Sequence, residues 1–325
     1  NIVDSFFTVI CNRNDFNGTV LVTVKDNIIY KKAFGYANFR TKDTLTENSI
    51  FQLASVSKQF TAVSIMMLQE KGLLAYNDDV TRFFPDFPYK GITIKLLLSH
   101  RSGLPNYMYF CDEFYKNKNV ALTNLGMIDL MIKNKPPEYF PPDKKFNYCN
   151  TNYCILAAIV EKVSKVSFAN FVRERIFKPI DMHYSFIGNQ DSAKYAQYVA
   201  SGHDENNKPI KWDYMDGILG DKGVFSCVND LNKWDMALYS GRIIKESTLA
   251  EAMKPANGDM IGSRNYGYGW RIKFLADNTP LFYHGGWWKG YNTYFMRNPK
   301  DHSSIIILSN KVNWSFNSIT SFIPL

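Results

Sequence analysis

The strongest constraint on the fold is where the strand-like segments lie along the 325 residues. Residues 18–25 and 28–34 are rich in β-branched side chains and flank Asp26 and Asn27, a pair typical of a tight hairpin turn. Further strand-like segments lie only near the other end, at residues 268–274, 281–284, 292–296 and 303–308. Because short links join antiparallel strands, we expect one antiparallel sheet built from both chain ends.

The middle of the chain has helical periodicity and would form an insertion between the two parts of this sheet. The predicted helices cover residues 78–85, 92–98, 119–133, 151–166 and 168–177. An amphipathic helix is expected before the first strand, at residues 1–12, and another after the last strand, at residues 313–322. The segment 38–48 is polar and predicts a loop.

The composition excludes several classes of protein. Hydrophobic residues make up 46% of the chain, yet no apolar run approaches the roughly 18 residues that span a bilayer. The formal net charge is +8, but the basic residues are scattered, so we expect no nucleic-acid partner. A mildly basic surface would suit an anionic cell envelope. The sequence begins at Asn1 rather than Met, which we interpret as a fragment or a processed product.

The cysteine and histidine patterns predict neither a disulfide framework nor a metal site. The number of cysteines is odd and no Cys-x-x-Cys occurs, so we expect buried thiols. The five histidines are isolated from one another and no His-Glu-x-x-His occurs. We therefore expect no metal and no cofactor. The cysteines are Cys11, Cys111, Cys149, Cys154 and Cys227.

One helix start places a serine and a lysine three residues apart. Apolar residues recur at helical spacing between residues 60 and 68, and Gly72 is a stop signal. Ser55 and Lys58 would therefore meet on one face of the first turn. A lysine whose ammonium form is disfavoured by burial can take the proton of a serine hydroxyl. The alternative is a helix-capping serine beside an exposed lysine.

A loop before the helix 151–166 holds Tyr148 and Asn150. A tyrosine can relay protons between a leaving group and water if cationic neighbours stabilise its phenolate form. Asn150 offers an acceptor and a donor, which suits the positioning of Lys58 and of a substrate amide. The same Tyr-x-Asn spacing occurs elsewhere in the chain, and a simply packed tyrosine is the alternative.

A third candidate segment ends the strand 281–284 and continues as Gly285, Gly286 and Trp287. Two glycines at a strand end let the backbone approach a ligand closely. The backbone N–H of Trp287 could pair with that of Ser55 to form an oxyanion hole for acyl transfer. His284 could supply positive charge or a hydrogen bond beside the tyrosine. The alternative is a glycine turn between strands.

Ser-x-x-Lys, Tyr-x-Asn and His-x-Gly, in that order, resemble the serine β-lactamase and penicillin-binding protein superfamily. The most similar branch is the group of class C β-lactamases, D-alanyl-D-alanine carboxypeptidases and esterases. The resemblance extends from about residue 18 to residue 310. It is also carried by segments 97–105, 220–226, 229–234 and 266–270.

The resemblance implies an α+β fold, an α/β sandwich with an antiparallel sheet flanked by helices, plus a mostly helical lobe. The site would lie between these two parts. Residues 1–80 together with 258–325 would form the sheet domain, and residues 81–257 the helical lobe. This division agrees with the strand-poor middle of the chain.

The resemblance also implies a role for each site residue. Ser55 would be the acylated nucleophile, and Lys58 its proton acceptor or electrostatic partner. Tyr148 would shuttle protons and activate the deacylating water, while Asn150 holds the site together.

The remaining implied roles are those of substrate-binding residues. His284 stands where this group often has His or Lys, and Gly286 would keep the strand open to substrate. The N–H groups of Ser55 and Trp287 would form the oxyanion hole. The expected partner is a small-molecule or peptide substrate of a bacterial, exported or periplasmic enzyme associated with the cell envelope.

Gly285 departs from the pattern of the group, because lactamases and carboxypeptidases usually carry Thr or Ser there. That hydroxyl helps to hold the substrate carboxylate. We therefore expect an esterase, amidase or D-amino-acid peptidase that acts through an acyl-enzyme. A penicillin-binding carboxypeptidase or weak class C-type β-lactamase is the first alternative, and a catalytically silent binding module is the second.

Overall fold

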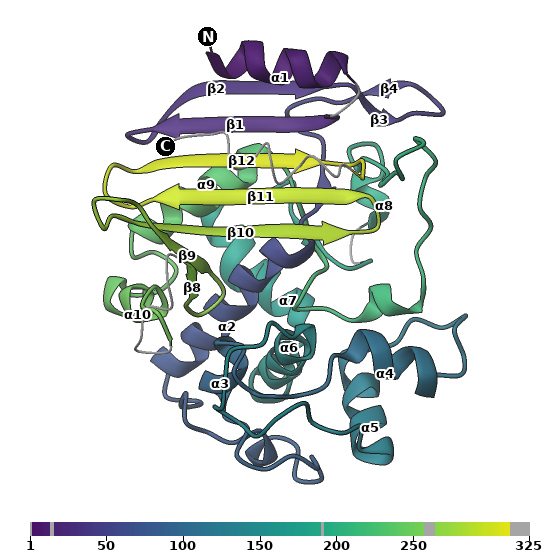
Figure 1. The fold of residues 1–325 in the computed structure, drawn as a ribbon, viewed down its shortest axis with the longest axis vertical. Helices are drawn as coiled ribbons and strands as arrows, with labels where there is room; N and C mark the ends of the chain where they lie inside the picture. Colours follow the sequence, from purple (N-terminus) through teal and green to yellow (C-terminus); the bar gives the residue numbers. More distant parts are fainter. Residues whose placement is uncertain (1, 14–15, 190–191, 257–263, 313–325) are drawn as a thin grey trace.

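The computed structural model describes residues 2–13, 16–189, 192–256 and 264–312. Within these ranges a seven-stranded sheet has the order β2-β1-β12-β11-β10-β9-β8, with every pair antiparallel (Figure 1). The predicted single sheet from both chain ends is therefore confirmed. Its strands are β1 (Gly18–Val24), β2 (Asn27–Phe34), β8 (Arg264–Tyr266), β9 (Arg271–Phe274), β10 (Pro280–Trp288), β11 (Tyr291–Asn298) and β12 (Ser303–Ser309).

Two details of the strands differ from the prediction. The first hairpin turns at Lys25 and Asp26, one residue earlier than expected. Both residues adopt positive φ, which the tight hairpin turn requires at its two central positions. Strand β10 continues through Gly285 and Gly286 to Trp288, since both glycines pair with β11. The two glycines therefore lie inside a strand rather than at its end.

Short strands form two smaller sheets that the sequence pattern did not predict. Strand β5 (Phe51–Gln52) pairs with β7 (Val224–Ser226), which also pairs with β6 (Phe186–Ile187). Strands β3 (Tyr36–Asn38) and β4 (Asp43–Thr44) form the other pair, and β4 lies within the segment 38–48 that was expected to be a loop. Strands of two or three residues are too short to show a period, so periodicity does not detect them.

Most of the predicted helices are present with shifted bounds. Residues 78–85 are the exception, because they form only the 3-10 turn η2 (Val80–Arg82). The expected helix 313–322 lies outside the described residues. The α-helices are α1 (Ile2–Asn12), α2 (Lys58–Glu70), α3 (Ile94–Leu98), α4 (Tyr107–Phe114), α5 (Asn124–Asn134), α6 (Asn150–Ser164), α7 (Phe168–Val172), α8 (Ser192–Tyr195), α9 (Val228–Tyr239) and α10 (Glu246–Ala252). The other helical turns are η1 (Ala54–Ser57), η3 (Arg173–Phe177), η4 (Lys178–Ile180) and η5 (Tyr214–Gly217).

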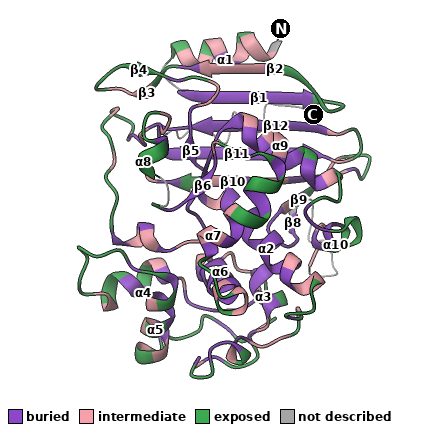
Figure 2. Cartoon of the chain, turned by 180° about the vertical axis from the view of Figure 1, so that it is seen from behind, coloured by how far each residue is buried: buried purple, intermediate pink, exposed green. Residues whose placement is uncertain are grey.

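Helices cover both faces of the central sheet. Helix α1 packs on β2, and its Phe7 joins a small core on that side (Figure 1). Helix α9 packs on β12 and β1 from the other side, where the larger core lies. Strand β12 is buried along its whole length, as expected for a strand covered on both faces (Figure 2).

The turn η1 and helix α2 connect the sheet to the remaining helices. Turn η1 packs on β10 and β11, and α2 packs on α6, which also contacts α3, α4 and α5. This arrangement brings three distant parts of the chain to the start of α2. Helix α9 packs on the sheet, although it falls in the range 81–257 that was assigned to the helical lobe. The division into a sheet domain and a helical lobe stays a prediction.

Among the described residues, no helix is both long enough and apolar enough to cross a membrane. Four of the five cysteines are buried free thiols, as predicted, and Cys11 is half-buried.

Candidate active site

Ser55 lies in a tight turn that the neighbouring strands hold in place. Ala54 adopts φ of 47°, an uncommon conformation for a residue with a side chain. The hydroxyl of Thr293 on β11 donates to the carbonyl oxygen of Leu53 at 2.7 Å, which fastens the turn to the sheet. The sequence predicted an α-helix here, but residues 54–57 form a 3-10 turn, in which side chains three apart lie above one another. Ser55 Oγ and Lys58 Nζ are accordingly 3.0 Å apart.

Lys58 is completely buried, and its amine has three polar neighbours. Besides Ser55 Oγ, Nζ lies 2.9 Å from Asn150 Oδ1 and 2.9 Å from the carbonyl oxygen of Asp221. Both of these oxygens can only accept hydrogen bonds. Two N–H groups of the Lys58 amine therefore point at these oxygens, and the third position on Nζ faces the Ser55 hydroxyl. The predicted Ser55–Lys58–Asn150 grouping is present.

The ring of Tyr148 lies over this amine. Lys58 Nζ is 4.9 Å from the ring centroid, and the guanidinium carbon of Arg271 is also 4.9 Å from it. Tyr148 precedes α6, and Asn150 is the first residue of that helix. The sequence reasoning did not single out Arg271, which comes from β9 and adds a second cation at the ring face.

His100 supports the loop that carries Tyr148, and it too was missed as a site residue. Its ring centroid lies 4.3 Å from that of Tyr148. The Cys149 N–H donates to His100 Nδ1 at 3.1 Å, and the His100 carbonyl accepts from the Asn147 N–H at 2.8 Å. The segment 97–105 did signal the family resemblance, but nothing local in it indicated this contact.

The surroundings of His284 favour its neutral form, so of the two roles expected for it a hydrogen bond fits better than a positive charge. Burial, and then the nearby Arg271, lower the pKa of the His284 imidazole well below 6.5. Its Nδ1 lies 2.7 Å from the Gly285 carbonyl oxygen and must donate to it, so Nε2 accepts from the Tyr266 hydroxyl at 3.1 Å. The ring centroids of His284 and Tyr148 are 6.0 Å apart, so the polar partner of His284 is Tyr266.

The two buried histidines predict a loss of stability in mild acid. Burial also lowers the pKa of His100 in the folded protein well below 6.5, the ordinary value that holds in the unfolded chain. At a pH between these two pKa values, each histidine binds a proton in the unfolded chain but not in the folded protein. Stability is therefore full above pH 6.5 and falls as the pH drops, by about 1.4 kcal/mol per pH unit for each histidine. Urea unfolding at about pH 6.5 and pH 5 measures this slope. The His284→Gln variant should show a smaller slope, and an unchanged slope would contradict the prediction.

Gly286 is required by the close approach of β10 to the Ser55 turn. A Cβ atom at this position would overlap the carbonyl oxygen of Leu53 and the hydroxyl of Thr293, and would lie 2.9 Å from the Ser55 nitrogen. The predicted role of this glycine was to leave the strand open to substrate. The space beside it is instead filled by the backbone of the turn.

Gly285 and Trp287 lie on the same strand with different surroundings. A Cβ atom at Gly285 would meet Thr293 O at 3.7 Å and Tyr294 Cδ2 at 3.9 Å, which are ordinary contact distances. Trp287 has 57% of its surface exposed, so its side chain is available to a ligand. The strand therefore brings Gly286 to the turn while Trp287 stays open to solvent.

A buried charged cluster adjoins Lys58 on the side away from Ser55. Asp221 and Lys222 are each 3% exposed, and Lys222 Nζ lies 3.7 Å from the Asp221 carboxylate. Lys222 donates to the Tyr107 hydroxyl at 2.7 Å, and Tyr107 donates to Asp221 at 3.0 Å. The Cys154 thiol donates to the same carboxylate at 3.4 Å. The segment 220–226 was singled out in the sequence only because it resembles the family. Its contacts with Tyr107 and Cys154 join residues far apart in the chain, so no local pattern predicts them.

Removing the Asp221 carboxylate should destabilise the protein strongly. In Asp221→Ala the buried Lys222 ammonium loses its counter-charge, which typically costs about 3–5 kcal/mol. Urea unfolding near neutral pH measures the change. Asp277→Ala is the matched control, because the Asp277–Lys300 pair is 58% and 66% exposed and, screened by solvent, should contribute far less. Equal losses in the two variants would contradict the expectation.

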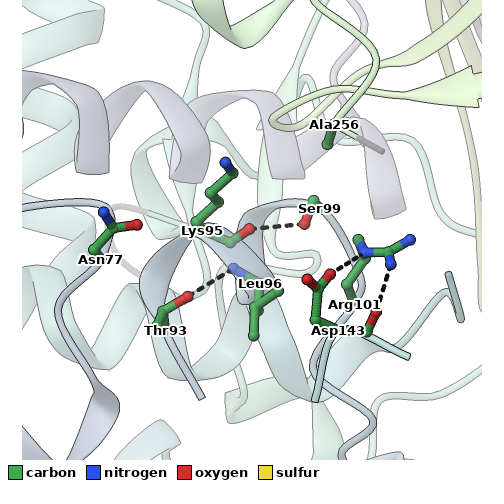
Figure 3. A pocket seen from close by; sticks show the side chains of 8 residues that line it. All are labelled: Asn77, Thr93, Lys95, Leu96, Ser99, Arg101, Asp143 and Ala256. Carbon is green, nitrogen blue, oxygen red and sulfur yellow. Dashed lines mark hydrogen bonds and ion pairs between the residues drawn. The ribbon is translucent and has the colours of Figure 1, made fainter. Parts of the chain in front are cut away.

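A hollow beside α3 is lined by none of these residues. It has a volume of about 380 Å³, and Lys95, Ser99 and Arg101 are among the side chains that line it (Figure 3). Arg101 Nε donates to the Asp143 carboxylate at 2.5 Å on its wall. None of the predicted site residues lines it. Within the described ranges, no group of three or more His, Cys, Asp and Glu side chains could hold a metal ion.

The sequence matches a known protein family over most of its length. Residues 8–321 match the family model described as Beta-lactamase. The chain belongs to the beta-lactamase family. Penicillin-binding protein 4* of Bacillus subtilis (strain 168) is 36% identical over 326 residues, which cover 95% of this chain and 71% of that relative.

Solved structures of this beta-lactamase fold superpose along nearly the whole chain. The penicillin binding protein from Bacillus halodurans has a TM-score of 0.83 at 24% identity and covers 97% of both chains. The D-amino acid amidase from Ochrobactrum anthropi SV3, complexed with L-phenylalanine, has a TM-score of 0.77 at 22% identity and covers 92% of this chain and 87% of its own. This beta-lactamase-family chain is a serine hydrolase with the fold of the penicillin-binding proteins.

Proposed function

We propose that the protein hydrolyses an ester, an amide or a D-amino-acid peptide through an acyl-enzyme on Ser55. The observation that carries this proposal is the 3.0 Å separation between Lys58 Nζ and Ser55 Oγ, with two carbonyl acceptors engaging the rest of the amine. A serine beside a buried amine with a free lone pair is an activated nucleophile.

In the proposed first step, Ser55 Oγ bonds to the substrate carbonyl carbon as its proton passes to Lys58. The developing oxyanion is held by the N–H groups of Ser55 and Trp287. The bond to the leaving group then breaks, and Tyr148 delivers a proton to that group. Asn150 keeps the Lys58 amine in place throughout.

In the second step, water adds to the acyl carbon and gives its proton to Tyr148. The bond to Ser55 Oγ breaks, Lys58 returns its proton to that oxygen, and the acid product leaves. Because Lys58 and Arg271 both lie over the Tyr148 ring, the charge that develops on its oxygen forms near two cations. His284, neutral and bonded to Tyr266, orients the strand rather than carrying charge.

The substrate class follows from the wall beside the nucleophile. Position 285 has no hydroxyl to hold a free carboxylate, and the exposed Trp287 offers an apolar surface. These features favour a neutral or apolar ester or amide over a free D-alanine carboxylate. The D-amino acid amidase with the same fold acts on amides by its name, which supports an amide among the substrates.

The mass of the intact protein after mixing with an activated short-chain ester tests the proposal. We expect a gain of one acyl group together with turnover of the ester, and neither in Ser55→Ala. No adduct and no turnover would support the catalytically silent binding module instead.

Penicillin binding is the second candidate function, because the relative from Bacillus subtilis is named a penicillin-binding protein. Gly285→Thr should strengthen it. The position has room for a side chain, and the added hydroxyl can bind a carboxylate. We expect at least a tenfold faster formation of a penicillin adduct on Ser55, measured by mass, with Gly285→Val as the control without a hydroxyl. Equal rates in the two variants would contradict this role of the hydroxyl.

We also propose that the protein is exported and works at the cell envelope. The formal charge of +8 supports attraction to an anionic surface. Fractionation of the producing cells tests this location, and recovery of the protein only in the cytosolic fraction would contradict it.

A further inference from the structure

One of the two oxygens beside the Lys58 amine belongs to the main chain, so its position depends on how the surrounding backbone is held. Lys58 Nζ lies 2.9 Å from the Asp221 carbonyl oxygen. Asp221 and Lys222 lie between η5 and β7, outside any helix or strand. Gly220 and Gly223 adopt φ of 102° and 97°, a region that glycine enters freely and other residues rarely adopt. Backbone preferences therefore do not fix this carbonyl group, and other contacts must do so.

A hydrogen bond to the preceding carbonyl group is not sufficient. The Thr61 hydroxyl donates to the Gly220 carbonyl oxygen at 2.7 Å. The next peptide unit can still turn about the two rotatable backbone bonds at the Asp221 Cα atom. That peptide unit joins Asp221 to Lys222, so anchoring these two side chains holds it from both ends.

Tyr107 anchors both side chains. Its hydroxyl donates to the Asp221 carboxylate at 3.0 Å and accepts from Lys222 Nζ at 2.7 Å. Tyr107 is fully buried at the start of α4, and its N–H donates to the Thr151 hydroxyl oxygen at 2.7 Å. Lys222 also donates to the Ile218 carbonyl oxygen at 3.0 Å. These contacts tie the peptide unit between residues 221 and 222 to helices α4 and α6.

The Asp221 carboxylate is also linked to the second oxygen beside the amine. Cys154 Sγ lies 3.4 Å from this carboxylate and 3.3 Å from the Asn150 carbonyl oxygen, one turn earlier on α6. The side-chain oxygen Oδ1 of Asn150 lies 2.9 Å from Lys58 Nζ. One buried carboxylate therefore connects both residues whose oxygens surround the Lys58 amine.

The burial of the cluster separates it from the substrate. Asp221 and Lys222 are each 3% exposed, and Tyr107 is fully buried. Stability alone does not account for the charged pair, because apolar side chains of similar size often replace a buried ion pair without loss. Hydrogen bonds add direction, since they weaken steeply when donor and acceptor turn away from each other.

We propose that Asp221 is a positioning residue for the Lys58 amine. Its carboxylate, together with Tyr107 and Lys222, holds the carbonyl oxygen that keeps the amine 3.0 Å from Ser55 Oγ. The inference rests on the proposed function, in which Lys58 takes the Ser55 proton. A shift of about 1 Å at a reacting group can lower a rate about 100-fold, so a loosened carbonyl group should slow the acylation of Ser55.

Two variants separate positioning from stability. Asp221→Asn leaves the buried Lys222 without its counter-charge and should be less stable. The combined variant Tyr107→Phe, Asp221→Leu and Lys222→Met replaces the cluster by apolar side chains of similar size, and its urea midpoint should stay near that of the parent.

Single-turnover kinetics with an activated ester measure the positioning. They give the limiting rate constant for acylation of Ser55 and the ester concentration at which half of this rate is reached. In both variants we expect the limiting rate constant to fall at least tenfold and the half-saturating concentration to stay within about threefold of the parent. A purely structural role would lower the amount of folded enzyme but not the rate constant of the folded molecules.

Asp235→Asn is the matched control, because Asp235 on α9 forms another buried ion pair, 2.9 Å from Arg297 Nε on β11. It should lose stability as Asp221→Asn does and keep the acylation rate constant of the parent. A limiting rate constant within about threefold of the parent in either cluster variant, or an equal fall in Asp235→Asn, would overturn the proposal.

Crystal structures of the parent and of the combined variant test the positioning without catalysis. In the variant we expect the separation between Lys58 Nζ and the carbonyl oxygen of residue 221 to exceed about 3.5 Å, the limit of a hydrogen bond. An unchanged separation would overturn the proposal, whatever the activity of the parent. A lengthened separation, with a parent that forms no acyl-enzyme, would support the positioning of the amine and overturn the proposed function.

Discussion

Replacing Lys58 by methionine is expected to lower kcat by about 1,000-fold or more, because the proposed general base is lost while the apolar volume is kept. The Ser55 hydroxyl would then have no acceptor for its proton, and acyl-enzyme formation would become the slow step. Single-turnover kinetics with an activated ester measure this step directly. The variant should also be less stable, since Asn150 Oδ1 and the Asp221 carbonyl oxygen each lose a buried donor at a cost of about 1–3 kcal/mol.

Thr61→Val separates the loss of the base from the loss of stability. Thr61 lies one turn further along α2, and its hydroxyl donates to the Gly220 carbonyl oxygen at 2.7 Å. Its removal breaks a buried hydrogen bond in the same helix without touching Ser55. We expect a comparable stability loss with kcat within about threefold of the parent. A Lys58→Met enzyme that keeps more than a tenth of the parent kcat would contradict the proposed base.

The second large effect is expected at Gly286. In Gly286→Ala the new methyl group meets the Leu53 carbonyl oxygen and the Ser55 nitrogen, so β10 and the serine turn must separate. A displacement of about 1 Å in a catalytic site can lower activity about 100-fold, and the overpacking itself costs about 1–3 kcal/mol. Ester turnover and urea unfolding measure the two effects.

Gly285→Ala is the matched control, because the same change one residue away meets only ordinary contacts. We expect activity within about threefold of the parent and a stability change below about 1 kcal/mol. If Gly286→Ala and Gly285→Ala had the same activity and stability, the close approach of β10 to the serine turn at Gly286 would not be what the site requires.

The sequence predicted the parts of this site that depend on local spacing. Ser55 and Lys58 meet because three residues of a helical turn separate them, and Asn150 follows Tyr148 at the start of a strongly apolar helix. The single sheet was predictable too, because its strands have clear β patterns at both chain ends. The roles of the site residues stay predictions.

The parts that were missed depend on tertiary contacts. Asp221 reaches Lys58 across 163 residues of sequence, and no local pattern marks its carbonyl oxygen as a ligand of the amine. His284 was predicted with two possible roles, and only its burial and the nearby Arg271 show that its neutral form is favoured. The position of Gly286 against the serine turn likewise appears only when β10 and η1 are packed together.

The pairing of β1 with β12 has a consequence for the synthesis of the protein. Gly18 lies opposite Ser309, so the central sheet cannot close until almost the whole described chain has left the ribosome. Contacts this distant in sequence form slowly, and the unpaired edge of β1 stays open meanwhile. The serine turn rests on β10 and β11, which are also among the last strands made. The Ser55 turn therefore gains its supporting strands only after residues up to about 309 have been synthesised.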